Sequence, residues 1–299
     1  MQAPDDFDPP IGRLERLEDG IQRIVAPNPS AMTYRGTNTY VLGKGPFAII
    51  DPGPVSDAHL NAILSVGDIS HIIVTHAHLD HSPLARPLSA ATGAPIYAFG
   101  PATAGRSAVM QSLAASGLAG GGEGIDADFA PDFELADGEG LQGDGWAVTA
   151  LHTPGHIGNH ISLACGDVCF TGDHVMGWAS SLVSPPDGDL TDFMASCARL
   201  AARKWRVFYP GHGAPVYEPA ECLKWLIAHR TSRETSILEI LTQGPATART
   251  LAEAIYSETP PALLGAAERN VLAHLIDLTG RAQVEPLGPL SAQATFRLT

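Results

Sequence analysis

The chain has 299 residues, 44% of them hydrophobic, which predicts a well-buried core in one large domain or in a large domain with a small one. Its formal net charge of −14 repels nucleic-acid phosphates, so nucleic acid is a disfavoured partner. The sequence opens without a secretory signal and has no apolar run of membrane-spanning length, which predicts a cytoplasmic protein with no membrane partner.

The N-terminal part of the chain alternates between short strands and helices. Apolar runs that stop at turn residues predict strands at 21–27, 38–43, 47–53, 71–75 and 95–99. Cap residues and helical spacing predict helices at 56–67 and 82–93, the second capped by Ser82 or Asp80. This order of strands and helices predicts an α/β architecture.

The middle of the chain is richer in strands, which follow a flexible loop predicted for the glycine run at 117–124. Strands are predicted at 146–153, 160–165, 168–173 and 206–213, the last leading into a glycine turn. The second and third of these fit a hairpin. Apolar side chains at helical spacing predict a helix at 191–205.

The C-terminal tail predicts a small winged-helix domain. Its signals are helices at 221–244, 248–257 and 265–280 and strands at 281–286 and 294–299. The predicted domains are therefore 1–230 and 231–299. The second contains five Arg and seven Asp or Glu, a net charge of 5 − 7 = −2, whereas a DNA-reading winged helix is normally basic. This domain is expected to pack or to dimerise, which would make the protein a homo-oligomer.

The stretch THAHLDH at 75–81 places four metal-binding side chains directly after a predicted buried strand. Residues i and i+2 of an extended chain project to the same side, so His76 and His78 can face one metal ion. Asp80 and His81 lie where the chain turns into a helix and can face a second point. A single histidine here would be an ordinary polar loop residue, but four such side chains in six positions indicate a metal site.

Three further turns repeat this pattern of a strand, small residues and one metal-binding side chain. They contain His156 in HTPGHIGNH, Asp173 in FTGDHV and His212 in YPGHG. Glycine in such a turn lets the backbone approach a bound group closely. Imidazole and carboxylate ligands suit zinc, and iron or manganese also fits a mixed nitrogen and oxygen site.

The THAHLDH stretch resembles the HxHxDH signature of the metallo-β-lactamase fold superfamily. The resemblance implies a four-layer αβ/βα sandwich and a site for two Zn²⁺ ions. It implies one ion on His76, His78 and His156, the other on Asp80, His81 and His212, and Asp173 as a bridge between them. Asp51, in IIDPG, matches an acidic position that supports the metal loop. The segment 32–43 and the tail resemble the β-lactamase-like protein 2 group, which adds a C-terminal winged-helix domain.

A binuclear site of this kind predicts a hydrolase. Two divalent ions about 3.5–4 Å apart can share a water and lower its pKa toward ~7, so that a bridging hydroxide is the nucleophile at neutral pH. The expected substrate is a small molecule with an ester, thioester or lactone carbonyl, and Asp80 is expected to orient the hydroxide and relay its proton.

Two other functions stay open. The β-lactamase-like protein 2 group includes a single-stranded RNA endonuclease, so the alternative is a phosphodiesterase or endoribonuclease, which the same metal site would serve and the net charge disfavours. A winged-helix regulator with a vestigial hydrolase domain is the third interpretation. It is disfavoured because all seven metal-binding residues are retained.

The remaining reactive residues have plainer interpretations. His160 and His174 flank ligand positions and either hydrogen-bond the ligands or have a structural role. The loop 174–189 is the best candidate for a pocket wall, with Met32 and Tyr34 as weaker ones. Five histidines are expected to be surface or core polar residues: His59, His71, His152, His229 and His274. Four cysteines are expected to be free thiols: Cys165, Cys169, Cys197 and Cys222.

Overall fold

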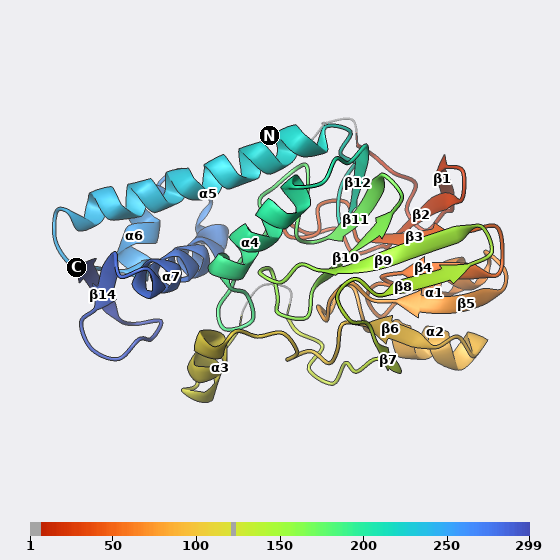
Figure 1. Cartoon of the computed structure of the whole chain (residues 1–299), viewed down its shortest axis with the longest axis horizontal. Coiled ribbons are helices and arrows are strands. Elements are labelled where there is room, and N and C mark those ends of the chain that lie inside the picture. The colour runs from red at the N-terminus through yellow and green to blue at the C-terminus, as the bar shows by residue number, and fades with distance from the viewer. Residues whose placement is uncertain (1–6, 121–123) are drawn as a thin grey trace.

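Two β-sheets form the centre of the protein in a computed structural model that describes residues 7–120 and 124–299 (Figure 1). The first sheet has seven strands in chain order: β1 (Glu15–Glu18), β2 (Ile21–Val25), β3 (Asn38–Leu42), β4 (Phe47–Ile50), β5 (Ile69–Ile73), β6 (Ile96–Ala98) and β7 (Phe133–Glu134). The second has five strands in the order β12 (Val207–Pro210), β11 (Val168–Gly172), β10 (Ile161–Cys165), β9 (Trp146–His152) and β8 (Gly140–Gly143). The predicted hairpin is confirmed by the antiparallel pairing of β10 with β11.

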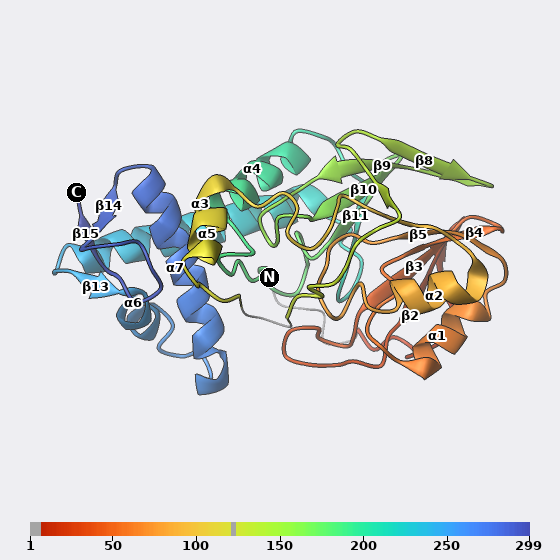
Figure 2. The ribbon, with the colours of Figure 1, turned by 90° about the horizontal axis from the view of Figure 1, so that it is seen from below.

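The two sheets pack face to face and each is covered by helices on its outer side. Tyr40 of the first sheet and Phe170 of the second meet between the sheets at a ring separation of 5.0 Å. Helices α1 (Asp57–Leu64) and α2 (Ala85–Thr92) cover the outer face of the first sheet (Figure 2). Helices α4 (Leu190–Ala201) and α5 (Pro219–Leu241) cover the second. The predicted four-layer αβ/βα sandwich is therefore confirmed.

The C-terminal unit lies at one end of the molecule (Figure 1). Its elements beyond α5 are β13 (Ala246–Thr247), α6 (Ala248–Ile255), a 3₁₀ turn (Pro261–Leu263), α7 (Leu264–Gly280), β14 (Val284–Pro286) and β15 (Thr295–Leu298). The predicted winged helix is confirmed. Helix α5 runs without interruption through the predicted boundary at 230/231, with Leu226 in the core beside the second sheet and Ile237 in the core of the C-terminal unit. The division at that point stays a prediction.

Some local predictions need correction. Neither Ser82 nor Asp80 caps α2, which begins after Leu84 without a side-chain cap. The Ser82 hydroxyl instead donates to the Asp126 carboxylate at 2.8 Å. Helix α3 (Ala108–Ala115) was not predicted, although the hydroxyl of Ser107 caps it. The short strands β1, β7, β8 and β13 were not predicted either.

Other expectations can be compared directly with the described residues. Of the loop predicted at 117–124, residues 121–123 lie outside them. The four cysteines are free thiols, as predicted. Within the described part of the chain, none of the helices combines the length and apolar character needed to cross a bilayer.

Candidate metal centre

The seven predicted metal-binding residues come together where four segments leave the two sheets. Four of them, His76, His78, Asp80 and His81, follow β5, whereas His156, Asp173 and His212 follow β9, β11 and β12 in turn. Each of the seven is at most 8% exposed. Strands β11 and β12 are parallel neighbours, so their carboxyl ends deliver Asp173 and His212 to the same edge of the second sheet.

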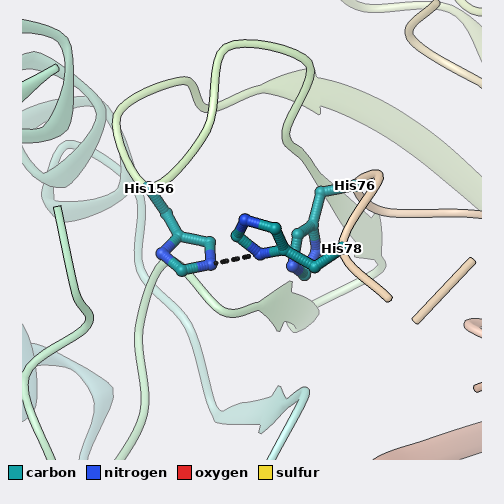
Figure 3. Close-up of side chains that lie close together, drawn as sticks. All are labelled: His76, His78 and His156. Atoms are coloured by element: carbon teal, nitrogen blue, oxygen red, sulfur yellow. Dashed lines mark hydrogen bonds between the residues drawn. The ribbon is translucent and has the colours of Figure 1, made fainter. Parts of the chain in front are cut away.

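Three imidazoles form the first group. Ligand atoms of His76, His78 and His156 lie within 4.8 Å of one another. Nε2 of His156 is 3.0 Å from Nδ1 of His78, so these two nitrogens lie opposite each other across a short gap (Figure 3). Burial, reinforced by the neighbouring His156, lowers the pKa of His78 to about 3. The neutral ring therefore has a nitrogen lone pair to offer to a cation.

Two imidazoles and two carboxylates form the second group. Nε2 of His212 lies 3.0 Å from Oδ2 of Asp80 and 3.2 Å from Oδ2 of Asp173. Nε2 of His81 lies 3.4 Å from Oδ2 of Asp80 and 3.5 Å from Oδ1 of Asp173. Oδ2 of Asp173 is also 3.8 Å from Nε2 of His156 in the first group. Asp173 thus contacts both groups.

In three of the imidazole rings, a hydrogen bond made by Nδ1 determines that Nε2 faces the centre of the metal-binding cluster. Nδ1 of His156 donates to the carbonyl of Leu182 at 2.7 Å, and Nδ1 of His212 donates to the carbonyl of Gly36 at 3.2 Å. Nδ1 of His81 donates to Oδ2 of Asp51 at 2.9 Å. With the proton on Nδ1, each ring presents the Nε2 lone pair to the centre, which is the usual arrangement for metal-binding histidines.

Thr75 orients His76 in a similar way. The Thr75 hydroxyl donates to Oδ2 of Asp51 at 2.7 Å, so at its 2.9 Å contact with Nδ1 of His76 it is the acceptor. Oδ1 of Asp51 accepts the backbone N–H of Thr75 at 2.7 Å. Both Asp51 oxygens are therefore occupied, as the expected supporting role requires. The role of Thr75 was not predicted, because a hydroxyl beside a histidine is too common a pair to stand out.

The donor atoms of the cluster fit a bound metal ion. Among the described residues, no hydrogen bond is made by Nε2 of His76, Oδ2 of Asp80 or Oδ1 of Asp173, although all three atoms are buried. The two carboxylate oxygens face the Nε2 atoms of His81 and His212, which carry no proton in this tautomer. Unpaired buried polar atoms are costly in a folded protein and usually have a functional reason. Nitrogen and carboxylate donors in this mixture suit zinc, iron or manganese.

The electrostatics of the second group also favour a bound cation. Burial alone would raise the pKa of Asp173, but His212 and His81 outweigh it, and this pKa lies well below its usual range. Burial alone would lower the pKa of His212, but Asp173 and Asp80 raise it to about 10. The carboxylates therefore stabilise positive charge at the centre of the group, which a bound metal ion would supply in place of a proton on Nε2 of His212.

A pocket opens onto both groups and confirms part of the predicted wall. Met176, Leu182, Ser184 and Asp187 come from the loop 174–189, and Met32 comes from the segment before β3. The remaining lining residues are His78, Asp80, His156, Asp173 and His212. Tyr34 was predicted at the wall; its ring stacks on that of Trp178 at 5.1 Å, and it is not among the lining residues.

The other histidines divide as follows. Nε2 of His160 accepts the backbone N–H of Asp173 at 3.2 Å, so His160 supports that residue. His174 has a structural position, 3.4 Å from the sulfur of Cys197 and 4.4 Å from the ring of Phe193. The remaining five do not belong to the cluster: His59 and His274 are buried, and His71, His152 and His229 are partly exposed.

Comparisons with known proteins agree with this geometry. A sequence model described as the metallo-beta-lactamase superfamily matches residues 32–212, and one described as the beta-lactamase associated winged helix domain matches residues 247–288. A beta-lactamase-like protein 2 homolog of Drosophila melanogaster is 31% identical and the match covers 90% of each chain. An atrochrysone carboxyl ACP thioesterase of Aspergillus fumigatus is 27% identical, covering 84% of this chain and 78% of its own.

A solved structure extends the similarity to three dimensions. A metallo-beta-lactamase family protein of Thermus thermophilus superposes with a TM-score of 0.76 at 25% identity. The match covers 95% of this chain and 100% of that protein. The likeness therefore includes both the sandwich and the C-terminal unit.

Proposed function

The chain belongs to the metallo-beta-lactamase superfamily of hydrolases, and we propose that it uses two metal ions to hydrolyse a small-molecule thioester. The observation that carries the proposal is the position of Asp173. Its Oδ2 lies 3.2 Å from Nε2 of His212 in one group and 3.8 Å from Nε2 of His156 in the other. A carboxylate that lies between two groups of imidazoles is suited to bridging two cations.

The proposed ligand sets follow the two groups of side chains. One ion would be held by His76, His78 and His156, the other by Asp80, His81 and His212, with Asp173 shared between them. Zinc is the proposed metal because of its affinity for imidazole and carboxylate donors. When bound, the ions supply Lewis-acid chemistry, which lowers the pKa of water and polarises a substrate carbonyl.

The side chain of Asp80 is proposed to orient the attacking water. It lines the pocket, and its pKa is lowered: burial would raise it, but His81 and His212 together outweigh burial. The side chain is therefore an ionised carboxylate at neutral pH, with oxygens that can accept a hydrogen bond from water and so orient it.

The pocket walls favour an acyl group over a polyanion. Met32, Met176 and Leu182 offer an apolar surface next to the metal-binding residues. The whole chain carries a net charge of −14, which disfavours an extended phosphate backbone. A thioester is the proposed class within the esters, thioesters and lactones because a relative that matches 84% of this chain bears the name of a thioesterase.

A direct test compares thioester and RNA substrates. Zinc-loaded protein is offered short and medium acyl-coenzyme A thioesters, with thiol release as the readout, and a single-stranded RNA of equal concentration. We expect thiol release that stops when a chelator is added, and no cutting of RNA. Cutting of RNA without thiol release would replace the proposal by the endoribonuclease alternative.

A variant and a matched control complete this test. His156→Ala is expected to lower kcat at least about 100-fold because it removes a ligand of one ion. His229→Gln is the control, because His229 is a partly exposed histidine on α5, stacked on Trp225, that does not belong to the metal centre. Equal activity of the two variants would contradict the assignment of His156.

A further inference from the structure

We infer that Asn270, on helix α7 of the C-terminal unit, is a positioning residue for the candidate metal ligand His156. The inference rests on the proposed function, because it requires His156 to bind a metal ion. According to this inference, the winged-helix unit not only packs against the end of the sandwich but also helps to orient a ligand of the metal centre.

A single peptide group connects the two residues. The carbonyl of Leu182 accepts a hydrogen bond from Nδ1 of His156 at 2.7 Å. The N–H of the same peptide group, which belongs to Val183, donates to Oδ1 of Asn270 at 3.1 Å. A trans peptide is planar and its C=O and N–H point in opposite directions, so fixing the N–H also fixes the carbonyl. Asn270 therefore determines the direction of the carbonyl that orients His156.

The amide of Asn270 is itself held by a buried cation. Nη1 of Arg230 donates to Oδ1 of Asn270 at 3.0 Å, so this oxygen accepts from two donors and its assignment follows from the network. The Arg230 side chain is fully buried, with its guanidinium 5.0 Å from the ring centre of Phe193. A hydrogen bond from a charged donor is about twice as strong as a neutral one, so Arg230 holds Asn270 firmly.

Helices α5 and α7, which carry Arg230 and Asn270, also hold the neighbouring residues of the pocket wall. Nη2 of Arg230 donates to the carbonyl of Ser181, and the Ser181 hydroxyl donates to the backbone carbonyl of Asp173. Nη1 of Arg269, next to Asn270 on α7, donates to the Ser184 hydroxyl and the Pro185 carbonyl, both at 3.2 Å. Groups of the wall between Ser181 and Pro185 are thus held by helices α5 and α7.

Removal of the Asn270 amide should therefore lower the metal affinity of the centre. The Val183 N–H would lose its partner, and the Leu182–Val183 peptide group could rotate. The His156 ring would then lose its fixed direction, and its Nε2 would spend less time facing the other two imidazoles. Partners that orient a metal ligand typically change metal affinity 10–100-fold when they are removed.

The experiment measures zinc affinity by competition with a chromophoric chelator, using the full-length protein. Asn270→Ala is expected to bind zinc about 10-fold more weakly than wild type at one of two sites. Asn270→Asp keeps an oxygen acceptor at the same position and is expected to bind within about 2-fold of wild type. In turnover, Asn270→Ala should lower kcat more than it changes KM, because Asn270 does not line the pocket.

Thr191→Val is the matched control. The Thr191 hydroxyl donates to Oδ1 of Asp277 at 2.6 Å, so it also joins the sandwich to α7 but does not reach the pocket wall. Wild-type zinc affinity in this control, with weaker binding in Asn270→Ala, supports the inference. Wild-type affinity in Asn270→Ala, or equal weakening in Thr191→Val, overturns it.

Two further outcomes are distinguishable. Should Asn270→Ala fail to fold by circular dichroism, Arg230→Lys tests the same network, since lysine keeps the buried charge but lacks the planar fork that reaches both Asn270 and Ser181. Zinc affinity in Arg230→Lys equal to wild type would then overturn the inference. Absence of zinc binding in the wild type would overturn the proposed function and this inference together.

Discussion

Asp51 accepts the Nδ1 proton of His81 at 2.9 Å, and this contact leaves Nε2 of His81 to face Asp80 and Asp173. The same carboxylate accepts both the hydroxyl and the backbone N–H of Thr75. One buried acid therefore orients a candidate metal ligand and the start of the loop that carries three others.

Asp51→Asn should weaken both the metal site and the fold. An amide replaces one acceptor oxygen by a donor, so at least one buried donor of Thr75 or His81 loses its partner, at a cost of about 1–3 kcal/mol in the free energy of unfolding. Asparagine tolerates the φ of +50° at this position, so no backbone strain is added. Zinc affinity should fall about 10–100-fold, measured by chelator competition alongside urea unfolding.

Asp57→Asn provides the control for that substitution. Asp57 is an exposed acid in the first turn of α1, where the change should alter stability by less than about 0.5 kcal/mol. Zinc affinity of Asp51→Asn that matches the control would contradict the supporting role of Asp51.

Asp173→Ala should change the number of bound metal ions. Its carboxylate contacts His81 and His212 in one group and His156 in the other, so both sites lose a donor. We expect elemental analysis to find the metal content reduced from two ions per chain toward one or none. Asp167→Ala, an exposed acid paired with Arg206, should retain two ions. An unchanged count in Asp173→Ala would argue against a bridge.

Gly211 is the backbone neighbour that makes room for the second group. A Cβ on Gly211 would overlap Oδ1 of Asp173 and lie 2.7 Å from Cε1 of His81. Gly211→Ala should therefore displace both side chains and reduce activity by at least about 100-fold, since ligand geometry is disrupted directly. The check is a comparison of kcat and of zinc content with those of wild type.

Gly265→Ala is the corresponding control on helix α7. Apart from the adjacent backbone of the helix, no heavy atom lies within 4 Å of a Cβ added there, so alanine should stabilise the helix by up to about 1 kcal/mol and leave zinc content unchanged. Loss of zinc from both variants would show that small backbone changes disturb the site indirectly, and the steric argument at Gly211 would fail.

The sequence predicts the metal-binding side chains well because each follows a strong local signal. Strand β5 ends in an apolar run at 72–74, and THAHLDH after it concentrates four donors in six positions. His156, Asp173 and His212 each follow a strand and lie in glycine-containing turns. Once the two sheets face each other, these strand ends are brought to one edge, so side chains distant in sequence meet.

The groups that orient these side chains leave no such signal. His156 is directed by the carbonyl of Leu182 and His212 by the carbonyl of Gly36, and any residue supplies a carbonyl. Asn270 accepts the N–H of Val183, which lies 87 positions earlier in the chain. No local sequence pattern can reveal a contact over that separation. The cap predicted at Ser82 was wrong because tertiary contacts with Asp126 compete for the same hydroxyl.

His274, on the buried side of α7, makes the fold sensitive to acid. Burial, reinforced by the charge of Arg230, lowers its pKa to about 3. Neither ring nitrogen has a hydrogen-bond partner among the described residues, so the protonated ring has nothing to stabilise it. Since the unfolded chain titrates near pH 6.5, it binds more protons than the folded chain between pH 6.5 and 3, and the free energy of unfolding falls as pH decreases through this window.

His274→Leu should remove this contribution. Each pKa unit corresponds to about 1.4 kcal/mol, so lowering the pH from 7.5 to 5.0 should cost the wild type about 2 kcal/mol through His274 alone. Urea unfolding at the two pH values should therefore show a loss about 2 kcal/mol smaller in His274→Leu than in wild type. His59, whose pKa burial lowers to about 4, remains in both proteins and cancels in the comparison. An equal loss in the two proteins would mean that His274 binds protons alike in the folded and unfolded chains.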